Sequence, residues 1–200
     1  MARHTAVMSP DRRVPPAATE QHASGSSLSL SSFHGLAIEG ELAVKLLSTE
    51  GPDPAAWHVA YTPVVELHHG TFDGPATTRA AELIARNCIH AGVVATWEGA
   101  PECALSAVPL EVPLQVSIDG DEVEAPVLAA LCLEGATGPL ATVSWLAKRL
   151  KRHGRELKAG QIVLTATPGD LIPIQKPAQL SVTFAGRTSS CSVTAPDSKL

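Results

Sequence analysis

Residues 36–46 read LAIEGELAVKL, and this stretch decides the fold. Apolar residues fall at alternate positions on either side of Gly40, namely at Leu36, Ile38, Leu42, Val44 and Leu46. Glu39, Glu41 and Lys45 occupy positions between them. Successive side chains of a β-strand point to opposite faces of the sheet, so this alternation predicts a strand with a break near Gly40.

Further short strands are predicted along the rest of the chain. Their apolar and β-branched runs cover residues 61–67, 91–97, 112–118, 162–166, 180–184 and 190–193. The dipeptide Asp119-Gly120 predicts a tight hairpin. One helix is predicted over residues 77–88, and a second begins after Thr137 and ends before Gly154. Many short strands with two main helices indicate a β-rich α+β fold.

Composition and charge exclude several classes of protein. The net charge is −5, and the one dense basic run, residues 148–155, falls at the end of the second predicted helix, so we expect no nucleic acid partner. The four cysteines form no CxxC pair, which argues against a zinc ribbon or a disulfide scaffold. The sequence has neither an apolar run as long as a membrane span nor a secretory signal, so we expect a cytoplasmic protein without a membrane partner.

The first 32 residues differ from the rest in composition. They contain Pro15-Pro16 and the serine-rich run 24–32, and they lack an apolar period. We therefore expect a flexible tail over residues 1–32 and a catalytic domain over residues 33–200.

Three carboxylates lie within apolar segments: Glu39, Glu41 and Glu66. Glu39 and Glu41 are two residues apart, so they share one face of their strand. Two carboxylates about 4 Å apart repel by about 4 kcal/mol at an effective dielectric constant of about 20, and a divalent cation removes that repulsion. Two interpretations stay open, namely ligands of a Mg²⁺ or Mn²⁺ ion, or glutamates on the solvated face of an edge strand.

The order of several motifs resembles the fumarylacetoacetate hydrolase superfamily, and within it the branch of the 2-hydroxypenta-2,4-dienoate hydratases and 4-oxalocrotonate decarboxylases. The matching pieces are IEGELA at 38–43, PVVE at 63–66, IARN at 84–87, the turn at 119–120, the helix containing Pro139 and Trp145, LKAGQIVLT at 157–165 and IPI at 172–174. The resemblance implies a mixed sheet or roll of the superfamily's type, in an N-terminally shortened form.

The resemblance also implies an activity. In the family, the residues that match Glu39, Glu41 and Glu66 bind a divalent ion, Mg²⁺ or Mn²⁺, which chelates a 2-keto acid and stabilises its enolate. We therefore expect a metal-dependent hydratase (a lyase) that acts on a small 2-keto or 2-hydroxydienoate acid, as in aromatic catabolism. The alternatives are a decarboxylase or an acylpyruvate hydrolase on the same fold, or a non-catalytic relative that pairs with a partner subunit.

Several positions depart from the family's pattern. The family carries an N-terminal lysine that helps in proton transfer, and this chain has no counterpart to it. After the third carboxylate stand Leu67-His68-His69 in place of an Asp-Ser-Arg run, and Ala166 replaces an expected glycine. His68 and His69 are therefore candidate catalytic bases, of which one can face the metal, and a histidine pair on a surface loop is the alternative. Apolar strand surface exposed in a shortened domain predicts a homo-oligomer or a homologous partner subunit.

Overall fold

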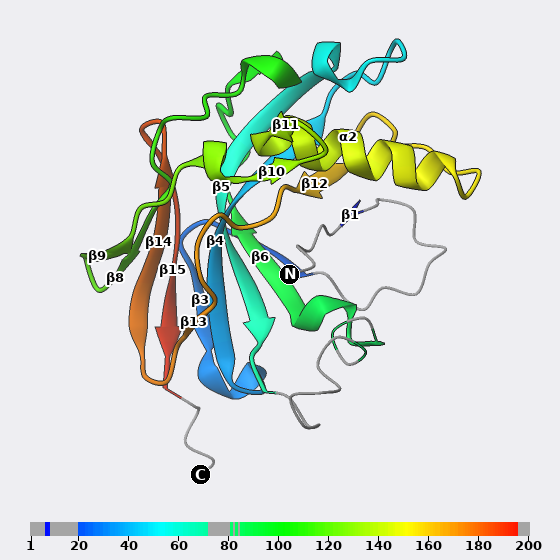
Figure 1. The fold of residues 1–200 in the computed structure, drawn as a ribbon. Coiled ribbons are helices and arrows are strands. Elements are labelled where there is room, and N and C mark those ends of the chain that lie inside the picture. Colours follow the sequence, from blue (N-terminus) through cyan, green and yellow to red (C-terminus); the bar gives the residue numbers. More distant parts are fainter. Residues whose placement is uncertain (1–6, 9–19, 72–80, 82, 84, 196–200) are drawn as a thin grey trace.

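Two β-sheets pack against each other in the part of the chain that the computed structural model describes, residues 7–8, 20–71, 81, 83 and 85–195 (Figure 1). The larger sheet runs in the order β1 (Val7–Met8), β12 (Ile162–Leu164), β4 (Leu36–Leu46), β5 (His58–His69), β6 (His90–Ala95) and β2 (Glu20–Ala23). Two further short strands join it, β13 (Ile172–Pro173) beside β4 and β7 (Glu102–Ala104) beside β5.

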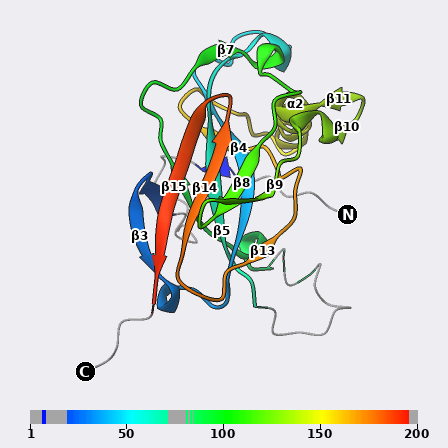
Figure 2. The ribbon, with the colours of Figure 1, turned by 90° about the vertical axis from the view of Figure 1, so that its left-hand side faces the viewer.

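The smaller sheet, in the foreground of Figure 2, has five strands. Their order is β3 (Ser26–Ser29), β15 (Arg187–Thr194), β14 (Ala178–Phe184), β8 (Gln115–Ile118) and β9 (Asp121–Glu124). The turn between β8 and β9 has positive φ at Asp119 (55°) and Gly120 (90°), as a two-residue hairpin of this kind requires. The hairpin predicted from Asp119-Gly120 is therefore confirmed.

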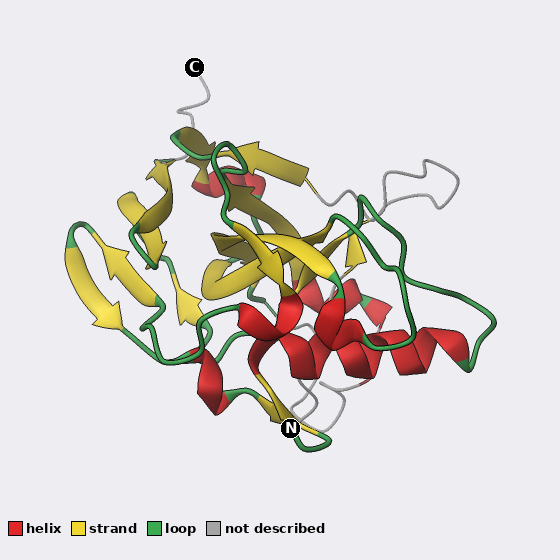
Figure 3. Cartoon of the chain, turned by 90° about the horizontal axis from the view of Figure 1, so that it is seen from above, coloured by secondary structure: helices red, strands yellow, loops and turns green. Residues whose placement is uncertain are grey.

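The α-helix α2 (Gly138–Lys151) lies near one end of the sheets, beside the small ribbon formed by β10 (Cys132–Leu133) and β11 (Ala136–Thr137) (Figure 3). Thr137 is its N-cap residue, and Gly154 follows its end with φ of 67°. Val143 and Leu146 are buried against the core, and the basic residues of the last turn complement the negative end of the helix dipole. Short 3-10 helices complete the described elements: η1 (Leu30–Ser32), η2 (Pro54–Ala56), η4 (Asn87–Ile89), η5 (Leu105–Ala107) and η6 (Leu128–Ala130).

The α+β class is confirmed, and the helix content differs slightly from the prediction. Of the helix predicted over residues 77–88, residues 81, 83 and 85 are helical, residues 77–80, 82 and 84 lie outside the described residues, and residues 87 and 88 belong to η4. Residues 162–166 form a shorter strand than predicted, because the chain leaves β12 after Leu164.

The central strand β4 is continuous, so the predicted break at Gly40 is wrong. Its eleven residues pair without interruption with β5, and Gly40 lies opposite Val65. A Cβ atom added at Gly40 would lie 2.4 Å from Cγ2 of Val116 and 3.6 Å from the methyl groups of Val182. Glycine is present here because the two sheets approach closely, and a strand accepts it without a bend.

Strand alternation gives β4 two different faces. The even-numbered residues Ile38, Leu42 and Val44 are fully buried in the main core, which the smaller sheet completes. The odd-numbered residues point to the other face, where a second, smaller apolar cluster consists of Ala43, Val64, Val93, Ala95 and Leu164. Glu39 and Glu41 belong to this second face. The alternation along β4 therefore places its core residues on one face and the two predicted metal ligands on the other.

Residues 20–32, which belong to the tail predicted over residues 1–32, form regular structure. β2 pairs in parallel with β6, and β3 pairs in parallel with β15. Between them, the backbone N–H of Ser24 donates to Ala95 in one sheet and that of Gly25 donates to Ser190 in the other. Backbone hydrogen bonds can hold a polar, serine-rich segment in a sheet without an apolar period, which explains why composition alone missed it.

Candidate metal centre

The carboxylates predicted as ligands lie on two adjacent central strands. Glu39 on β4 is the direct cross-strand partner of Glu66 on β5. Glu41 is two residues further along β4 and His68 two residues further along β5, so all four side chains share one face of the sheet. β4 lies between β12 and β5 and Glu41 is 2% exposed, so Glu39 and Glu41 do not line the solvated face of an edge strand.

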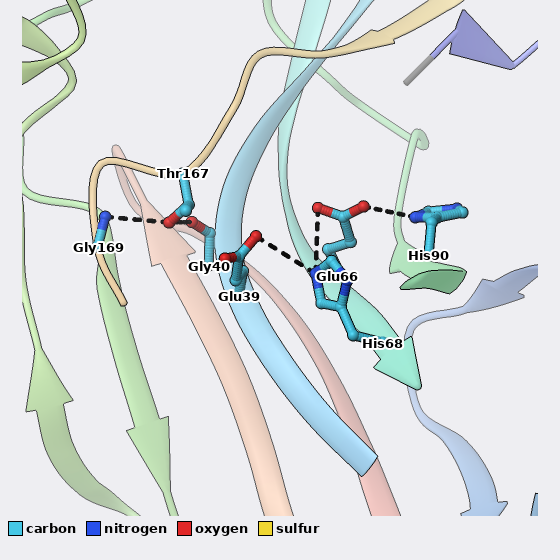
Figure 4. A network of polar contacts seen from close by, with 7 residues as sticks. All are labelled: Glu39, Gly40, Glu66, His68, His90, Thr167 and Gly169. Atoms are coloured by element: carbon cyan, nitrogen blue, oxygen red, sulfur yellow. Dashed lines mark hydrogen bonds and ion pairs between the residues drawn. The ribbon is translucent and has the colours of Figure 1, made fainter. Parts of the chain in front are cut away.

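His68 completes the cluster (Figure 4). Its Nε2 atom lies 3.3 Å from Oε2 of Glu39 and 3.5 Å from Oε2 of Glu66. One donor atom from each of these three residues lies within 4.8 Å of the other two. His68 is only 5% exposed, so the alternative of a surface loop histidine is wrong for this residue.

His69 lies elsewhere. As the next residue of β5 it points to the opposite face, where its Nδ1 atom accepts a hydrogen bond of 3.2 Å from the backbone N–H of His34. Its ring also packs against the rings of Phe33 and His34. The structure therefore brings His68 to the carboxylates and does not bring His69 there.

His90 is a member of the site that the sequence did not indicate. Its Nδ1 atom lies 2.5 Å from Oε1 of Glu66, while the other oxygen of Glu66 faces His68. A bulge in β5 between Leu67 and His68 aligns His68 with His90 on β6. His90 stands one residue before the predicted strand 91–97, and only the register across the sheet shows its partner.

The turn that delivers His90 is strained. Asn87, Cys88 and Ile89 have φ of 48°, 62° and 59°, a left-handed run that L-residues rarely adopt. Strain of this kind costs about 1–3 kcal/mol per residue and concentrates at functional sites. Here it places β6 so that its first residue contacts Glu66.

Burial and mutual charge perturb the ionisable groups. Burial raises the pKa of Glu41 well above its usual value, and the carboxylates of Glu66 and Glu39 raise it further. Burial opposes ionisation of Glu66 as well, but His68 and His90 outweigh it and lower the pKa of Glu66 to about 2. Burial lowers the pKa of His68, yet Glu39 and Glu66 raise it to about 9. The cluster therefore attracts positive charge strongly.

Several buried polar atoms of the cluster lack hydrogen-bond partners in the described part of the chain. They are Oε2 of Glu41, both ring nitrogens of His68 and Nε2 of His90. Unpartnered buried polar atoms are rare in proteins, since each costs about 1–3 kcal/mol. Carboxylate oxygens and an imidazole nitrogen that converge in this way are the groups that coordinate divalent cations, so the residues present fit a metal ion.

A loop after β12 covers the β4 side of the cluster. Thr167 donates from Oγ1 to the backbone oxygen of Gly40 at 3.0 Å, and the backbone N–H of Gly169 donates to the same hydroxyl at 3.0 Å (Figure 4). Ala166 has φ of 70°, and its backbone hydrogen bond lowers the pKa of Glu41. A glycine, which the resemblance leads us to expect at this position, would adopt such a φ without strain.

Solved structures with the same fold include metal-bound enzymes. A 4-oxalocrotonate decarboxylase from Pseudomonas putida G7, complexed with magnesium and adipate, is similar with a TM-score of 0.67 and 22% identity, over 88% of this chain and 66% of that chain. A fumarylpyruvate hydrolase from Pseudomonas aeruginosa, in complex with Mn²⁺ and pyruvate, is similar with a TM-score of 0.62 and 16% identity, over 88% and 75% of the two chains. A fumarylacetoacetate hydrolase from Exiguobacterium antarcticum has a TM-score of 0.57 and 17% identity, over 88% and 63%.

The chain therefore has the fold of the fumarylacetoacetate hydrolase superfamily, as the order of its motifs predicted. It spans 66% of the length of the decarboxylase that it matches. No family model matches the sequence, and no curated protein matches it. Within the described residues, every helix is too short or too polar to cross a membrane.

Proposed function

We propose that this protein is a divalent-metal-dependent lyase, a hydratase, that acts on a small 2-keto or 2-hydroxydienoate acid through an enolate. The observation that supports the proposal is that Glu39, Glu41 and Glu66 lie on the same face of the two central strands, close enough for the charges of Glu39 and Glu66 to raise the pKa of Glu41. Glu39 and Glu66 have ligand atoms within 4.8 Å of each other and of the His68 imidazole, and Glu41 lies close enough for their charges to raise its pKa, so a divalent cation would relieve the repulsion among the three acids.

In this proposal the carboxylates of Glu39, Glu41 and Glu66 hold the ion. Glu66 is the most firmly positioned of the three, because His90 fixes one of its oxygens. An ion held there would act as a Lewis acid toward the keto oxygen and stabilise the enolate. The apolar residues Ala43, Val64 and Val93 on the same face limit the access of water and strengthen the electrostatic interactions.

The substrate class is supported by two of the similar structures. One is complexed with magnesium and adipate, and the other is in complex with Mn²⁺ and pyruvate. Both are small carboxylic acids, and pyruvate is itself a 2-keto acid. A carboxylate with an adjacent keto oxygen can occupy two neighbouring positions on one ion, which supports the same class of substrate for this protein.

Decarboxylation is the second candidate reaction. It is favoured by the similarity to the 4-oxalocrotonate decarboxylase, which has the highest TM-score of the three structures described above. Both reactions pass through an enolate, so the cluster of carboxylates serves either one.

A panel of 2-hydroxydienoates and 2-keto acids, assayed with Mg²⁺, with Mn²⁺ and with EDTA, tests the proposal. Loss of dienoate absorbance reports hydration, and release of CO₂ reports decarboxylation. We expect turnover that requires the ion and is lost in Glu39→Gln, while Glu102→Gln, an exposed acid on β7, retains it. An ion-loaded protein without turnover on any member of the panel would contradict the proposal and support a non-catalytic relative.

The oligomer expected from the sequence stays a prediction, which sedimentation at micromolar concentration tests.

A further inference from the structure

We propose that the imidazole of His68 is itself a ligand of the ion, so that the centre has a mixed set of carboxylate and imidazole ligands. This inference rests on the proposed function, because it concerns the same ion. It differs from the three-carboxylate set that the family resemblance implies, since the residue corresponding to His68 lies in a run where this chain departs from the family's pattern.

The distances between the donor atoms carry the inference. Two ligand atoms that each lie about 2.1 Å from one ion are about 3.0–3.4 Å apart, for angles between octahedral and tetrahedral values. Nε2 of His68 lies 3.3 Å from Oε2 of Glu39 and 3.5 Å from Oε2 of Glu66. Both separations are close to that range, and the ligand atoms of Glu39 and Glu66 lie within 4.8 Å of each other.

The orientation of the ring supports the same conclusion. Nε2 of His68 points between the two carboxylates, and neither contact has the geometry of a hydrogen bond. A histidine whose only role was to pair with one carboxylate would align its N–H with one oxygen. A nitrogen directed at the space shared by two oxygens is instead placed as a third ligand.

Burial makes the alternative roles of His68 unfavourable. Its side chain is 6% exposed, and neither ring nitrogen has a hydrogen-bond partner among the described residues. Glu66 is held from its other side by His90, so its Oε2 atom stays directed toward His68. As a ligand, His68 would have its lone pair on the ion, so it would not be the general base that the sequence suggested.

An imidazole ligand changes which ions the centre prefers. Mg²⁺ favours oxygen ligands, whereas Fe²⁺, Co²⁺ and Zn²⁺ bind imidazole well. We therefore expect this centre to select such transition ions over Mg²⁺ more strongly than an all-carboxylate centre does.

Electron paramagnetic resonance of the full-length protein tests the inference with Mn²⁺, Co²⁺ and Mg²⁺ as probes. The electron spin echo of bound Mn²⁺ shows a coupling to ¹⁴N when an imidazole nitrogen is a ligand, and we expect this coupling in the wild-type protein. The signal of free Mn²⁺ measures the Kd, and competition gives the values for Co²⁺ and Mg²⁺. In His68→Gln we expect the ¹⁴N coupling to disappear and the Co²⁺ affinity to fall by about tenfold or more, with a change of less than about threefold for Mg²⁺.

The matched control is His58→Gln, an exposed histidine at the start of the same strand that contacts Glu102. It should retain the coupling and all three affinities. A wild-type spectrum without ¹⁴N coupling would overturn the inference even if His68→Gln fails to fold, and so would equal changes for Co²⁺ and Mg²⁺. Binding of Mn²⁺ without nitrogen coupling leaves the proposed function intact, whereas a protein that binds none of the three ions contradicts both.

Discussion

Glu39 and Glu66 lie directly opposite each other on β4 and β5, with both carboxylates on the same face of the sheet. Like charges at directly opposed positions destabilise paired strands. The ring of His68, whose Nε2 lies within 3.5 Å of an oxygen of each, offsets this repulsion in the metal-free protein. The side chains on this face of β4 and β5 therefore surround a position that favours a positive charge.

Glu41→Gln should leave the metal-free fold equally stable or stabilise it, because the substitution keeps the shape and removes a carboxyl group whose ionisation is opposed by burial and by the charges of Glu66 and Glu39. Metal affinity and any metal-dependent turnover should fall sharply, since a hard cation prefers anionic oxygen. Melting temperature with and without EDTA, together with turnover, measures both effects. If the variant stays active and EDTA does not change the melting temperature of the wild-type protein, a metal role for Glu41 would be contradicted.

The change of glutamate to glutamine at Glu66 should have the opposite effect on the stability of the metal-free protein. Glu66 is held by His68 and His90, which lower its pKa to about 2 although burial opposes its ionisation. Glu66→Gln removes charge-assisted contacts, so we expect the free energy of unfolding to fall by about 1.5–3 kcal/mol. Urea denaturation in EDTA measures it, with Glu122→Gln on the exposed strand β9 as the control. If Glu41→Gln and Glu66→Gln are equally stable, the two residues do not differ in their contribution to the metal-free fold, and this prediction is refuted.

The metal-free protein should lose stability in mildly alkaline solution. The pKa of His68 is about 9 in the folded protein, where Glu39 and Glu66 outweigh burial, against 6.5 for the unperturbed group. A raised folded pKa gives stability that is fully present below about pH 6.5 and is lost as the pH rises through about 9. We expect the difference in melting temperature between wild type and His68→Gln, both in EDTA, to shrink over this interval. A difference that stays constant from about pH 6 to 10 would show that His68 is not protonated in the fold.

Some parts of the site could be predicted from the sequence because they follow from strand alternation. The spacing of Glu39 and Glu41 sets their common face, and the adjacency of His68 and His69 guarantees that only one of them joins it. His90 could not be predicted, because its contact with Glu66 depends on a cross-strand register and on the bulge after Leu67. The parallel strands at residues 20–29 were missed because their pairing is a property of the backbone and leaves no apolar period.

The reason for glycine at position 40 could not be predicted from the sequence either, and it yields a further prediction. Gly40→Ala should destabilise the fold by about 1–3 kcal/mol, because the added methyl would lie 2.4 Å from Cγ2 of Val116 in the facing sheet. Urea denaturation measures this loss. Val116→Ala in the same background should recover part of it by making room. Additive effects of the two substitutions would mean that close approach of the sheets is not the reason for glycine at this position.

The central claim is that Glu39, Glu41, Glu66 and His68 surround one divalent ion, and anomalous diffraction from crystals soaked in Mn²⁺ tests it most directly. The account predicts one strong anomalous peak on the buried face of β4 and β5, within about 2.0–2.6 Å of carboxylate oxygens of Glu39 and Glu66. A map without a peak there, while those carboxylates keep the positions described above, would contradict it.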